Sequence, residues 1–310
     1  KCTRFYSKHY ASAGFEIGDV EQPDFFHNLP IVTKKHLRDS FDEFINVYEK
    51  QYLSTSTTGG STGVPVKCGY DKRYPSEAFS WRTLSWWGLH PWDDGGYVWR
   101  NPRTTRRSQL INQALWWPTK KIRLDASSMT AKSITDFIKL WNKIQPPQLQ
   151  GYVGAVVELA QYIESNNIKF HKPRVVWVTS APLSSVQRGI LERVFEAPVY
   201  DQYGCCEVSW IAAQCEQKDG LHVNTERVGL EFVDDNNFTV SKGEWGRTLV
   251  TRYDDFVFPL IRYEVGDTGR FLKNTCACGR TLPLIDQVKG RTTDTIRLPS
   301  GRILSGDYLT

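Results

Sequence analysis

Residues 55–67, with the sequence TSTTGGSTGVPVK, combine three glycines with six hydroxyl side chains and end on Lys67. Glycines let backbone N–H groups converge on an anion, and hydroxyls add donors, so this loop could wrap a phosphate group. A flexible linker is the alternative interpretation, because Gly/Ser/Thr-rich runs are commonly linkers. The loop alone does not decide between the two.

A second candidate lies in residues 201–207, DQYGCCE, where a predicted strand ends and the chain turns at Gly204. Ligands of α/β sheets bind beyond the carboxyl ends of the strands. Tyr203 could stack there on a flat ring, and Glu207 could hold a cation. A strand-end turn with a surface acid is the alternative.

A third candidate is Asp267, in the stretch LIRYEVGDTGR of residues 260–270. We expect Asp267 in a turn between two strand-like runs, where its carboxylate could accept two ribose hydroxyls or serve as an ordinary turn residue. In GRTTDTI, residues 290–296, Asp294 could mark a hinge or a simple cap.

The elements that position these residues alternate between strand and helix. Apolar residues at helical spacing predict helices after Thr33 and within residues 132–144 and 154–163, and Ser184 with Gln187 forms a capping box for another helix. A β-branched run predicts a buried strand over residues 175–179. This alternation is typical of an α/β fold with a largely parallel sheet.

After about residue 220 the pattern changes. GLEFVD, RTLVTRY and GRFLK predict short strands with no helix between them. We therefore expect a smaller β-rich subdomain beside the α/β part.

Composition limits the class of protein. The chain has 310 residues, 40% of them hydrophobic and 24% charged, which is ordinary for a globular protein. The net charge of +5 permits an anionic substrate without demanding nucleic acid. The sequence has no apolar run long enough for a membrane span, and its start has neither an initiator methionine nor the apolar core of a secretory signal.

The seven cysteines are an odd number, which argues against a secreted disulfide framework and for thiols or metal ligands in a cytoplasmic protein. Cys215, His222, Cys276 and Cys278 supply three thiolates and one imidazole, a complete tetrahedral set for Zn²⁺. Because four protein ligands leave no open position, we expect a structural site that ties the β-rich subdomain to the loop after Glu207. Scattered buried thiols are the alternative.

The order of the motifs favours one interpretation. The hydroxyl-rich loop near residue 60 is followed by TSAP near 180, xYGxxE near 205, RYxxGD near 265 and GRxxD near 292. This order resembles the adenylate-forming superfamily, which includes acyl-CoA synthetases, luciferases and peptide-synthetase adenylation domains. LPIVTKKHLR, FPLIRYEVGD and CACGRTLPLIDQVKGRTTD resemble its phenylacetate–CoA ligase-like group, in particular the capsule-biosynthesis (CapK-like) branch.

The resemblance implies roles for the matching residues. Glu207 would act in catalysis by ligating Mg²⁺, together with Lys67, and Asp294 would be the hinge for a small C-terminal domain. The loop would wrap the β- and γ-phosphates of ATP, the TSAP turn and Tyr203 would hold the adenine, and Asp267 with Arg262 would reach the ribose or phosphate. The implied nucleotide-binding set is Thr58, Gly59, Gly60, Ser61, Thr62, Gly63, Ser180, Ala181, Pro182, Tyr203, Gly204, Arg262 and Asp267.

The resemblance also implies a reaction and a domain plan. ATP would activate a carboxylic acid to an acyl-adenylate with release of pyrophosphate, and the acyl group would pass to CoA or to an amine or hydroxyl acceptor, in cell-surface polysaccharide biosynthesis. Residues 1–220 would form the nucleotide- and acyl-binding core, residues 221–290 a β-rich distorted barrel, and residues 291–310 the hinge and the start of a C-terminal domain that is mostly absent. No lysine of that domain is identified in this sequence.

The acyl pocket and the alternatives remain open at the level of sequence. Trp86, Trp87, Tyr152 and Trp210 are candidates for the pocket, although aromatics at helical spacing usually pack inward. Arg100, Arg103, Arg106 and Arg107 could contact an acidic or glycan substrate, or form a solvated face. A noncatalytic nucleotide-binding relative, a glycan- or nucleic-acid-binding protein and a metal-dependent hydrolase are the competing functions. Cys205 and Cys206 we expect to be small side chains beside the nucleotide.

Overall fold

In the computed structural model, the chain forms two compact units. The structure describes residues 2–16, 21, 25–57, 65–74, 77–100, 111, 114–289, 295–297 and 303–305. The β-rich unit comprises Lys1–Ser76, Gly204–Ala212 and Gly220–Thr310, and the α/β unit comprises Glu77–Tyr203 and Ala213–Asp219. The expected plan put residues 1–220 together; the first 76 residues group instead with the β-rich segment.

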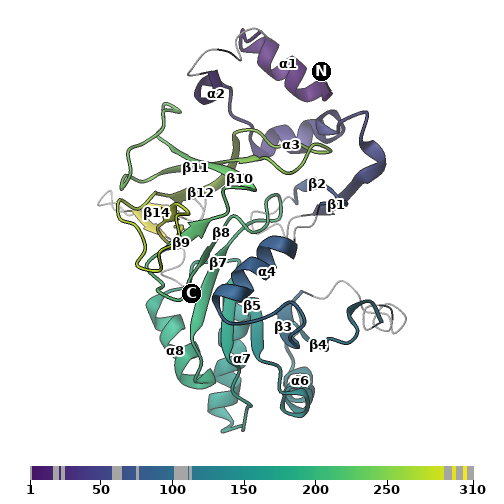
Figure 1. Cartoon of the computed structure of the whole chain (residues 1–310), viewed down its shortest axis with the longest axis vertical. Helices are drawn as coiled ribbons and strands as arrows, with labels where there is room; N and C mark the ends of the chain where they lie inside the picture. The colour runs from purple at the N-terminus through teal and green to yellow at the C-terminus, as the bar shows by residue number, and fades with distance from the viewer. Residues whose placement is uncertain are drawn as a thin grey trace. The chain divides into compact units, whose positions relative to one another are not determined.

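The α/β unit is built on a parallel sheet, as the sequence predicts (Figure 1). Five strands pair in parallel in the order β7 (Val199–Tyr203), β6 (Val175–Thr179), β5 (Gln148–Tyr152), β3 (Gly95–Trp99) and β4 (Lys121–Asp125). Strand β3 begins at Gly95, and the Trp141 indole packs so closely on Gly96 that a Cβ atom there would clash with the ring.

Helices of the α/β unit cover this sheet, and Figure 1 shows α7 and α8 beside strands β5 to β7. The helices are α4 (Glu77–Trp86), α6 (Ala131–Ile144), α7 (Val153–Ser165) and α8 (Ser185–Phe195). The predicted apolar face of α6 is buried, and the predicted capping box of α8 is present, since the Ser184 side chain accepts from the Gln187 backbone N–H. In the part of the chain that the structure describes, no helix is long and apolar enough to cross a membrane.

Both faces of the parallel sheet are buried. Val176 and Val178 of β6 belong to the core cluster that includes α6, α7 and α8. Trp177, between them, points to the other face. There the Trp87 ring lies 5.9 Å from Trp177 and stacks on Tyr200 at 5.0 Å. Trp87 is therefore a core residue of the α/β unit.

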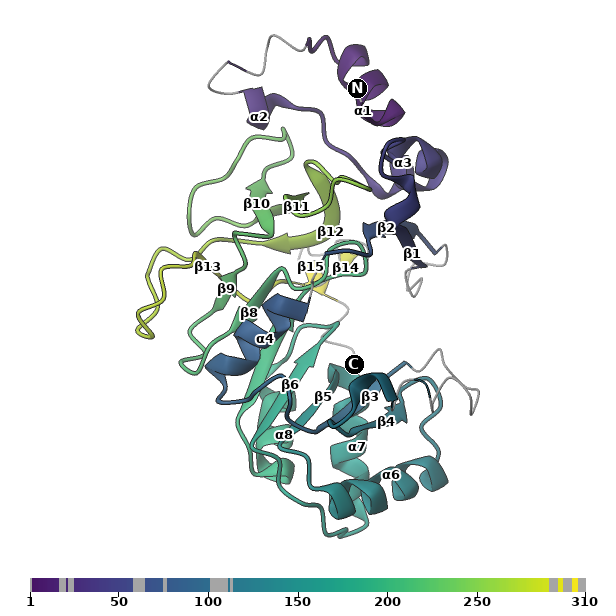
Figure 2. The same ribbon diagram turned by 45° about the vertical axis from the view of Figure 1, so that its right-hand side comes forward.

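The β-rich unit contains an antiparallel sheet of three strands, β10 (Val228–Val233), β11 (Gly246–Arg252) and β12 (Tyr263–Gly269), which Figure 2 shows side by side. This unit also contains helices α1 (Arg4–Ser12), α2 (Phe25–Asn28) and α3 (Lys34–Ser40), with 3₁₀ turns η2 (Phe41–Phe44) and η3 (Lys50–Tyr52). Its further strands are β1 (Leu53–Thr57), β2 (Lys67–Asp71), β9 (Leu221–Val223), β13 (Leu284–Ile285), β14 (Thr295–Arg297) and β15 (Ile303–Ser305). Strand β8 (Ala212–Gln214) begins in the β-rich unit at Ala212 and continues into the α/β unit.

The third strand of this sheet is not the expected GRFLK segment. Strand β12 lies earlier and contains Gly266 and Asp267, so Asp267 is in a strand and not in a turn. The pairing of β11 with β12 shifts register so that residues 265–267 face the single residue Thr248. Gly266 has φ +92°, a left-handed value that suits glycine in a β-bulge. The glycine–aspartate pair that predicted a turn in the sequence therefore forms a β-bulge within strand β12.

Contacts with β12 explain why the N-terminal residues belong to the β-rich unit. Val32 bridges to Tyr263 in parallel, and its N–H donates to the Arg262 carbonyl at 3.0 Å. The Arg262 guanidinium is almost fully buried and donates to the carbonyls of His27 and Leu29. Helix α3 follows from the predicted N-cap at Thr33.

Arg252, at the end of β11, joins three segments of the β-rich unit. Its Nη1 donates to the carbonyls of Gly69 and Glu207, both at 3.1 Å, and its Nη2 forms an ion pair with Asp255. Asp255 in turn accepts from the backbone N–H of Asp71 at 2.8 Å. Burial lowers the pKa of Arg252 to about 10, so the charged form depends on these partners.

We predict that Arg252→Met strongly destabilises the β-rich unit. Removing one partner of a buried ion pair leaves the other charge uncompensated, which costs roughly 3–5 kcal/mol. The measurement is the urea midpoint followed by tryptophan fluorescence. The control is Arg193→Met, because Arg193 forms an exposed ion pair with Glu164 at 3.0 Å and should change the midpoint little. Equal shifts in the two variants would contradict the prediction.

Candidate nucleotide site and metal centre

The carboxyl edge of the parallel sheet brings several predicted residues together within the α/β unit. The register pairs Tyr152 with Thr179, and Thr179 with Gln202. Tyr152, Ser180 and Tyr203 therefore lie at the ends of three neighbouring strands. This edge is where α/β sheets bind ligands.

The chain turns sharply at this edge, in the TSAP segment of residues 179–182. Ser180 directly follows β6, is exposed and has φ +82°, a left-handed value that is uncommon outside glycine. Ala181 is exposed and Pro182 half-buried before the N-cap of α8 at Ser184. Such a strained conformation at a strand end is typical of functional turns.

Glu207 is held in a fixed position within the β-rich unit. Its side chain is only 5% exposed, and its Oε1 accepts from the Tyr263 hydroxyl at 2.8 Å. Burial and the negative charge of Glu207 raise the pKa of Tyr263, so the phenol stays protonated and donates. Together with the Arg252 contact to its carbonyl, this fixes both the backbone and the side chain of Glu207.

Asp267 and Glu207 both lie close enough to the Cys205 thiol to change its pKa. Burial first, and then the carboxylates of Glu207 and Asp267, raise the pKa of Cys205. Lys34, at the start of α3, lies beside the bulge, with its Nζ 3.3 Å from the position that a Cβ atom would take on Gly266. Lys34 and Tyr263 were not among the predicted site residues, although they lie in the motifs LPIVTKKHLR and FPLIRYEVGD.

Two predicted residues have different surroundings from those expected. Arg262 was expected to reach the phosphate or ribose; its guanidinium instead donates to two backbone carbonyls and pairs with Glu231 at 3.3 Å. Its donors thus tie the N-terminal segment to the sheet. Lys67 is exposed, and its Nζ lies 4.2 Å above the Phe41 ring. Residues Thr58, Gly59, Gly60, Ser61, Thr62 and Gly63, as well as Asp294, lie outside the described residues.

The residues expected to contact an acyl group or a glycan also lie in different surroundings from one another. Trp87 is core, as the inward-packing alternative predicts, whereas Tyr152 at the sheet edge lies 4.4 Å from the Trp99 ring. Trp86 and Trp210 are half-buried. Arg100 is exposed, and Arg103, Arg106 and Arg107 are not among the described residues.

A polar pocket of about 400 Å³ opens next to Glu207 within the β-rich unit. Its walls include Tyr70, Tyr74, Cys206, Glu207, Arg227 and Asp254. Arg227 and Asp254 form a buried ion pair at 2.6 Å, and burial raises the pKa of Asp254. The adjacent acids in RYDD, residues 252–255, are the only local sign of this pocket in the sequence.

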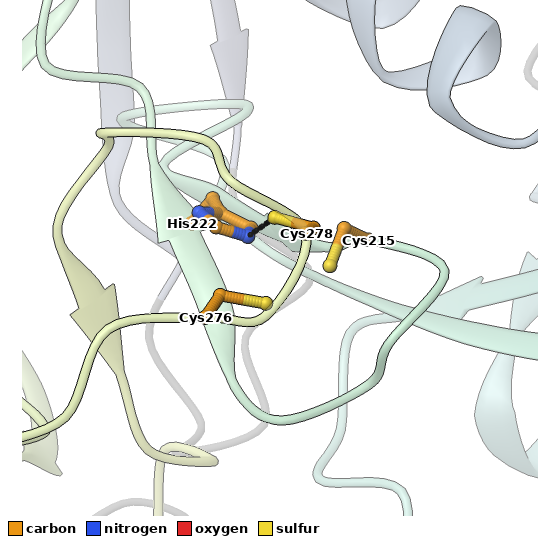
Figure 3. Close-up of side chains that lie close together, drawn as sticks. All are labelled: Cys215, His222, Cys276 and Cys278. Atoms are coloured by element: carbon orange, nitrogen blue, oxygen red, sulfur yellow. Dashed lines mark hydrogen bonds between the residues drawn. The ribbon is translucent and has the colours of Figure 1, made fainter.

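The predicted metal ligands do converge. The ligand atoms of Cys215, His222, Cys276 and Cys278 all lie within 4.8 Å of one another, and Figure 3 shows the four side chains facing a common point. Three of the four residues are buried and Cys278 is half-buried. Sulfurs of a tetrahedral zinc site lie about 3.8 Å apart, given Zn–S bonds of about 2.3 Å, so little contraction would be needed.

The surroundings of the cluster suit metal ligands. His222 Nδ1 lies 3.4 Å from the Leu282 carbonyl, which can only accept, so the Nδ1 proton points there and Nε2 faces Cys278 Sγ at 3.3 Å. The backbone N–H of Gln217 donates to Cys215 Sγ at 3.4 Å, and that of Arg280 to Cys278 Sγ at 3.5 Å. Such N–H···S contacts stabilise thiolates.

Comparison with known proteins identifies the fold. No protein-family model matches the chain. Crystal structures of 2-hydroxyisobutyryl-CoA ligase match with a TM-score of 0.82 in complex with R3-HIB-AMP and 0.80 in complex with 2-HIB-AMP and CoA. In both, 98% of this chain is covered, at 21% and 20% identity, along with 66% and 73% of the ligase. The chain therefore has the fold of adenylate-forming enzymes.

Two curated proteins are similar to the chain in sequence. CapK of Staphylococcus aureus is 24% identical over 252 residues, which are 78% of this chain and 53% of CapK. The phenylacetate–coenzyme A ligase of Thermus thermophilus is 30% identical over 98 residues, 30% of this chain and 22% of the ligase. The chain is thus similar in sequence to CapK and, over a shorter segment, to a phenylacetate–coenzyme A ligase. It spans about half the length of CapK.

We predict that Tyr263→Phe lowers the free energy of unfolding by roughly 1.5–3 kcal/mol, the contribution of a hydrogen bond to a charged group. The variant keeps the ring and removes only the donor to the buried Glu207 carboxylate. Urea titration measures the change. Tyr253→Phe is the control, since that ring is 50% exposed, and a loss no greater than in the control would refute the role of this hydrogen bond.

Proposed function

We propose that the protein uses ATP to convert a carboxylic acid into an acyl-adenylate, with release of pyrophosphate, and then transfers the acyl group. The observation that carries the proposal is Glu207, a buried carboxylate fixed by Tyr263 and Arg252 only four residues after Tyr203 at the sheet edge. The fold and the order of the five motifs support the same reaction.

In this proposal the chain binds and orients the two reactants. Ser180, Ala181 and Pro182 line the adenine, Tyr203 stacks on it beside Gly204, and Asp267 accepts the ribose hydroxyls. Residues 58–63 and Lys67 donate to the β- and γ-phosphates. Positioning dominates, because the carboxylate and the α-phosphate are both anionic and must be held in contact.

Glu207 holds Mg²⁺ in this scheme, with Tyr263 orienting the carboxylate. When bound there, Mg²⁺ would supply positive charge that offsets the negative charge of the phosphates. Asp267, Lys34 and Glu207 belong to the same unit. Asp294 is the proposed hinge toward a C-terminal domain.

The acceptor and the pathway follow from the relatives. Two of the 2-hydroxyisobutyryl-CoA ligase structures hold CoA, and the motifs of this chain resemble the capsule-biosynthesis branch, so we infer transfer to CoA or to an amine or hydroxyl in cell-surface polysaccharide biosynthesis. A cytoplasmic location is part of this proposal, because ATP and CoA are available there.

We predict that the intact protein catalyses ATP–pyrophosphate exchange with at least one member of a panel of carboxylic acids. Glu207→Gln should lower the exchange rate at least about 10²-fold, the usual loss when one transition-state electrostatic contact is removed. Glu264→Gln is the matched control, because Glu264 lies on the same strand as Tyr263 but pairs with Arg247 at 2.8 Å. Its rate should stay within about twofold to threefold.

Two negative results have different meanings. ATP binding without exchange for any acid would favour a noncatalytic nucleotide-binding relative. Neither binding nor exchange would discard the proposal.

We further propose that Cys215, His222, Cys276 and Cys278 hold a structural Zn²⁺ ion. The protein purified without added metal should contain about one equivalent of zinc by elemental analysis, and Cys276→Ser should lose it and melt at a lower temperature. Cys2→Ser, an exposed cysteine outside the cluster, is the control and should keep the zinc. Less than about half an equivalent in the unmodified protein would count against the site.

A further inference from the structure

Cys68 and Cys206 form a second pair of thiols that the proposed reaction does not use. Cys68 lies in β2 and Cys206 in the turn before Glu207, 138 residues apart in sequence. Their sulfur atoms are 3.4 Å apart. Ser56 Oγ lies within reach of both sulfurs, at 3.2 Å from Cys68 and 3.1 Å from Cys206. Both cysteines belong to the β-rich unit.

The two thiols differ in accessibility. Cys206 is exposed, whereas Cys68 is fully buried. A reagent in solution can therefore reach Cys206 first, and Cys68 can react only with what Cys206 carries. This is the arrangement of an accessible thiol beside a resolving one.

The neighbouring Cys205 does not share this geometry. Its Sγ accepts from the backbone N–H of Val208 at 3.3 Å, within its own turn. The zinc-ligand candidates form a separate cluster. Cys68 and Cys206 are thus a pair that a disulfide could join with little movement, since the sulfurs need to approach by only about 1.4 Å to reach the bonding distance.

We propose that Cys68 and Cys206 are a site of reversible covalent modification by low-molecular-weight disulfides. Cys206, as thiolate, attacks one sulfur of a small disulfide RSSR, forming Cys206–S–S–R and releasing RS⁻. Cys68 then loses its proton and attacks the Cys206 sulfur, which releases the second RS⁻ and closes the Cys68–Cys206 disulfide. The small disulfide is reduced to two thiols, and the two cysteines are oxidised.

The bond would connect two segments that the fold otherwise joins through Arg252. Strand β2 follows residues 58–63, and the Cys206 turn carries Glu207. Cys206 also lines the polar pocket beside Glu207. Oxidation would therefore add a covalent link between β2 and the Glu207 turn, beside the polar pocket, to the contacts that Arg252 already makes.

The test treats the full protein, with its native metal content, with oxidised glutathione. Free thiols are then blocked, and the unreduced protein is digested and mapped by mass spectrometry. The expected product is a cross-linked peptide containing Cys68 and Cys206, lighter by two hydrogens than the two reduced peptides, that disappears on addition of dithiothreitol. In Cys68→Ala, a glutathione adduct should accumulate on Cys206 instead, and in Cys206→Ser neither product should form.

Cys2→Ser is the matched control, because Cys2 is exposed but outside the pair, and it should give the cross-link as efficiently as the unmodified protein. A stable glutathione adduct on Cys206 with Cys68 still free, or a cross-link from Cys206 to any other cysteine, would overturn the proposal. Both readouts are masses, so they stand whether or not the protein exchanges pyrophosphate. Circular dichroism of Cys68→Ala confirms that the buried substitution leaves the protein folded.

Discussion

The buried guanidinium of Arg252 is the constraint on which the proposed site depends. One nitrogen holds the carbonyls of Gly69 and Glu207, and the ion pair with Asp255 compensates the charge. Asp255 also accepts from the backbone N–H groups of Val257 and Phe258, so its second oxygen is satisfied as well. Buried charges persist only with this degree of pairing. The strand after the hydroxyl-rich loop and the turn with Glu207 are therefore fixed to one another by a single side chain.

The N-terminal residues pack against strand β12 and are part of the β-rich unit. The Arg262 guanidinium holds the segment before α3 against β12, and α3 carries Lys34 to the bulge next to Asp267. Arg262 therefore contributes to the site by positioning, although its own donors are used by the protein.

Local signals made parts of the structure predictable from sequence. The face of α6 and the capping box at Ser184 depend on spacing within a few residues, and both are confirmed. The convergence of Cys215, His222, Cys276 and Cys278 was predictable because three cysteines and a histidine form a rare set of potential ligands. Asp267 was misplaced in a turn because a glycine in a bulge and a glycine in a turn give the same local pattern. The contacts of Arg252 and Arg262 were not predictable, since their partners are backbone carbonyls far away in sequence.

The polar pocket of the β-rich unit and the sheet edge of the α/β unit differ in chemistry. The pocket is lined by the Arg227–Asp254 ion pair and by Glu207, and a hydrocarbon chain there would remove water from charged groups and replace none of their hydrogen bonds. At the sheet edge of the α/β unit, Tyr152 lies against the Trp99 ring and offers an aromatic surface. An apolar group is therefore better accommodated beside Tyr152, whereas the pocket suits a hydroxyl-rich or charged group that can exchange hydrogen bonds with its walls.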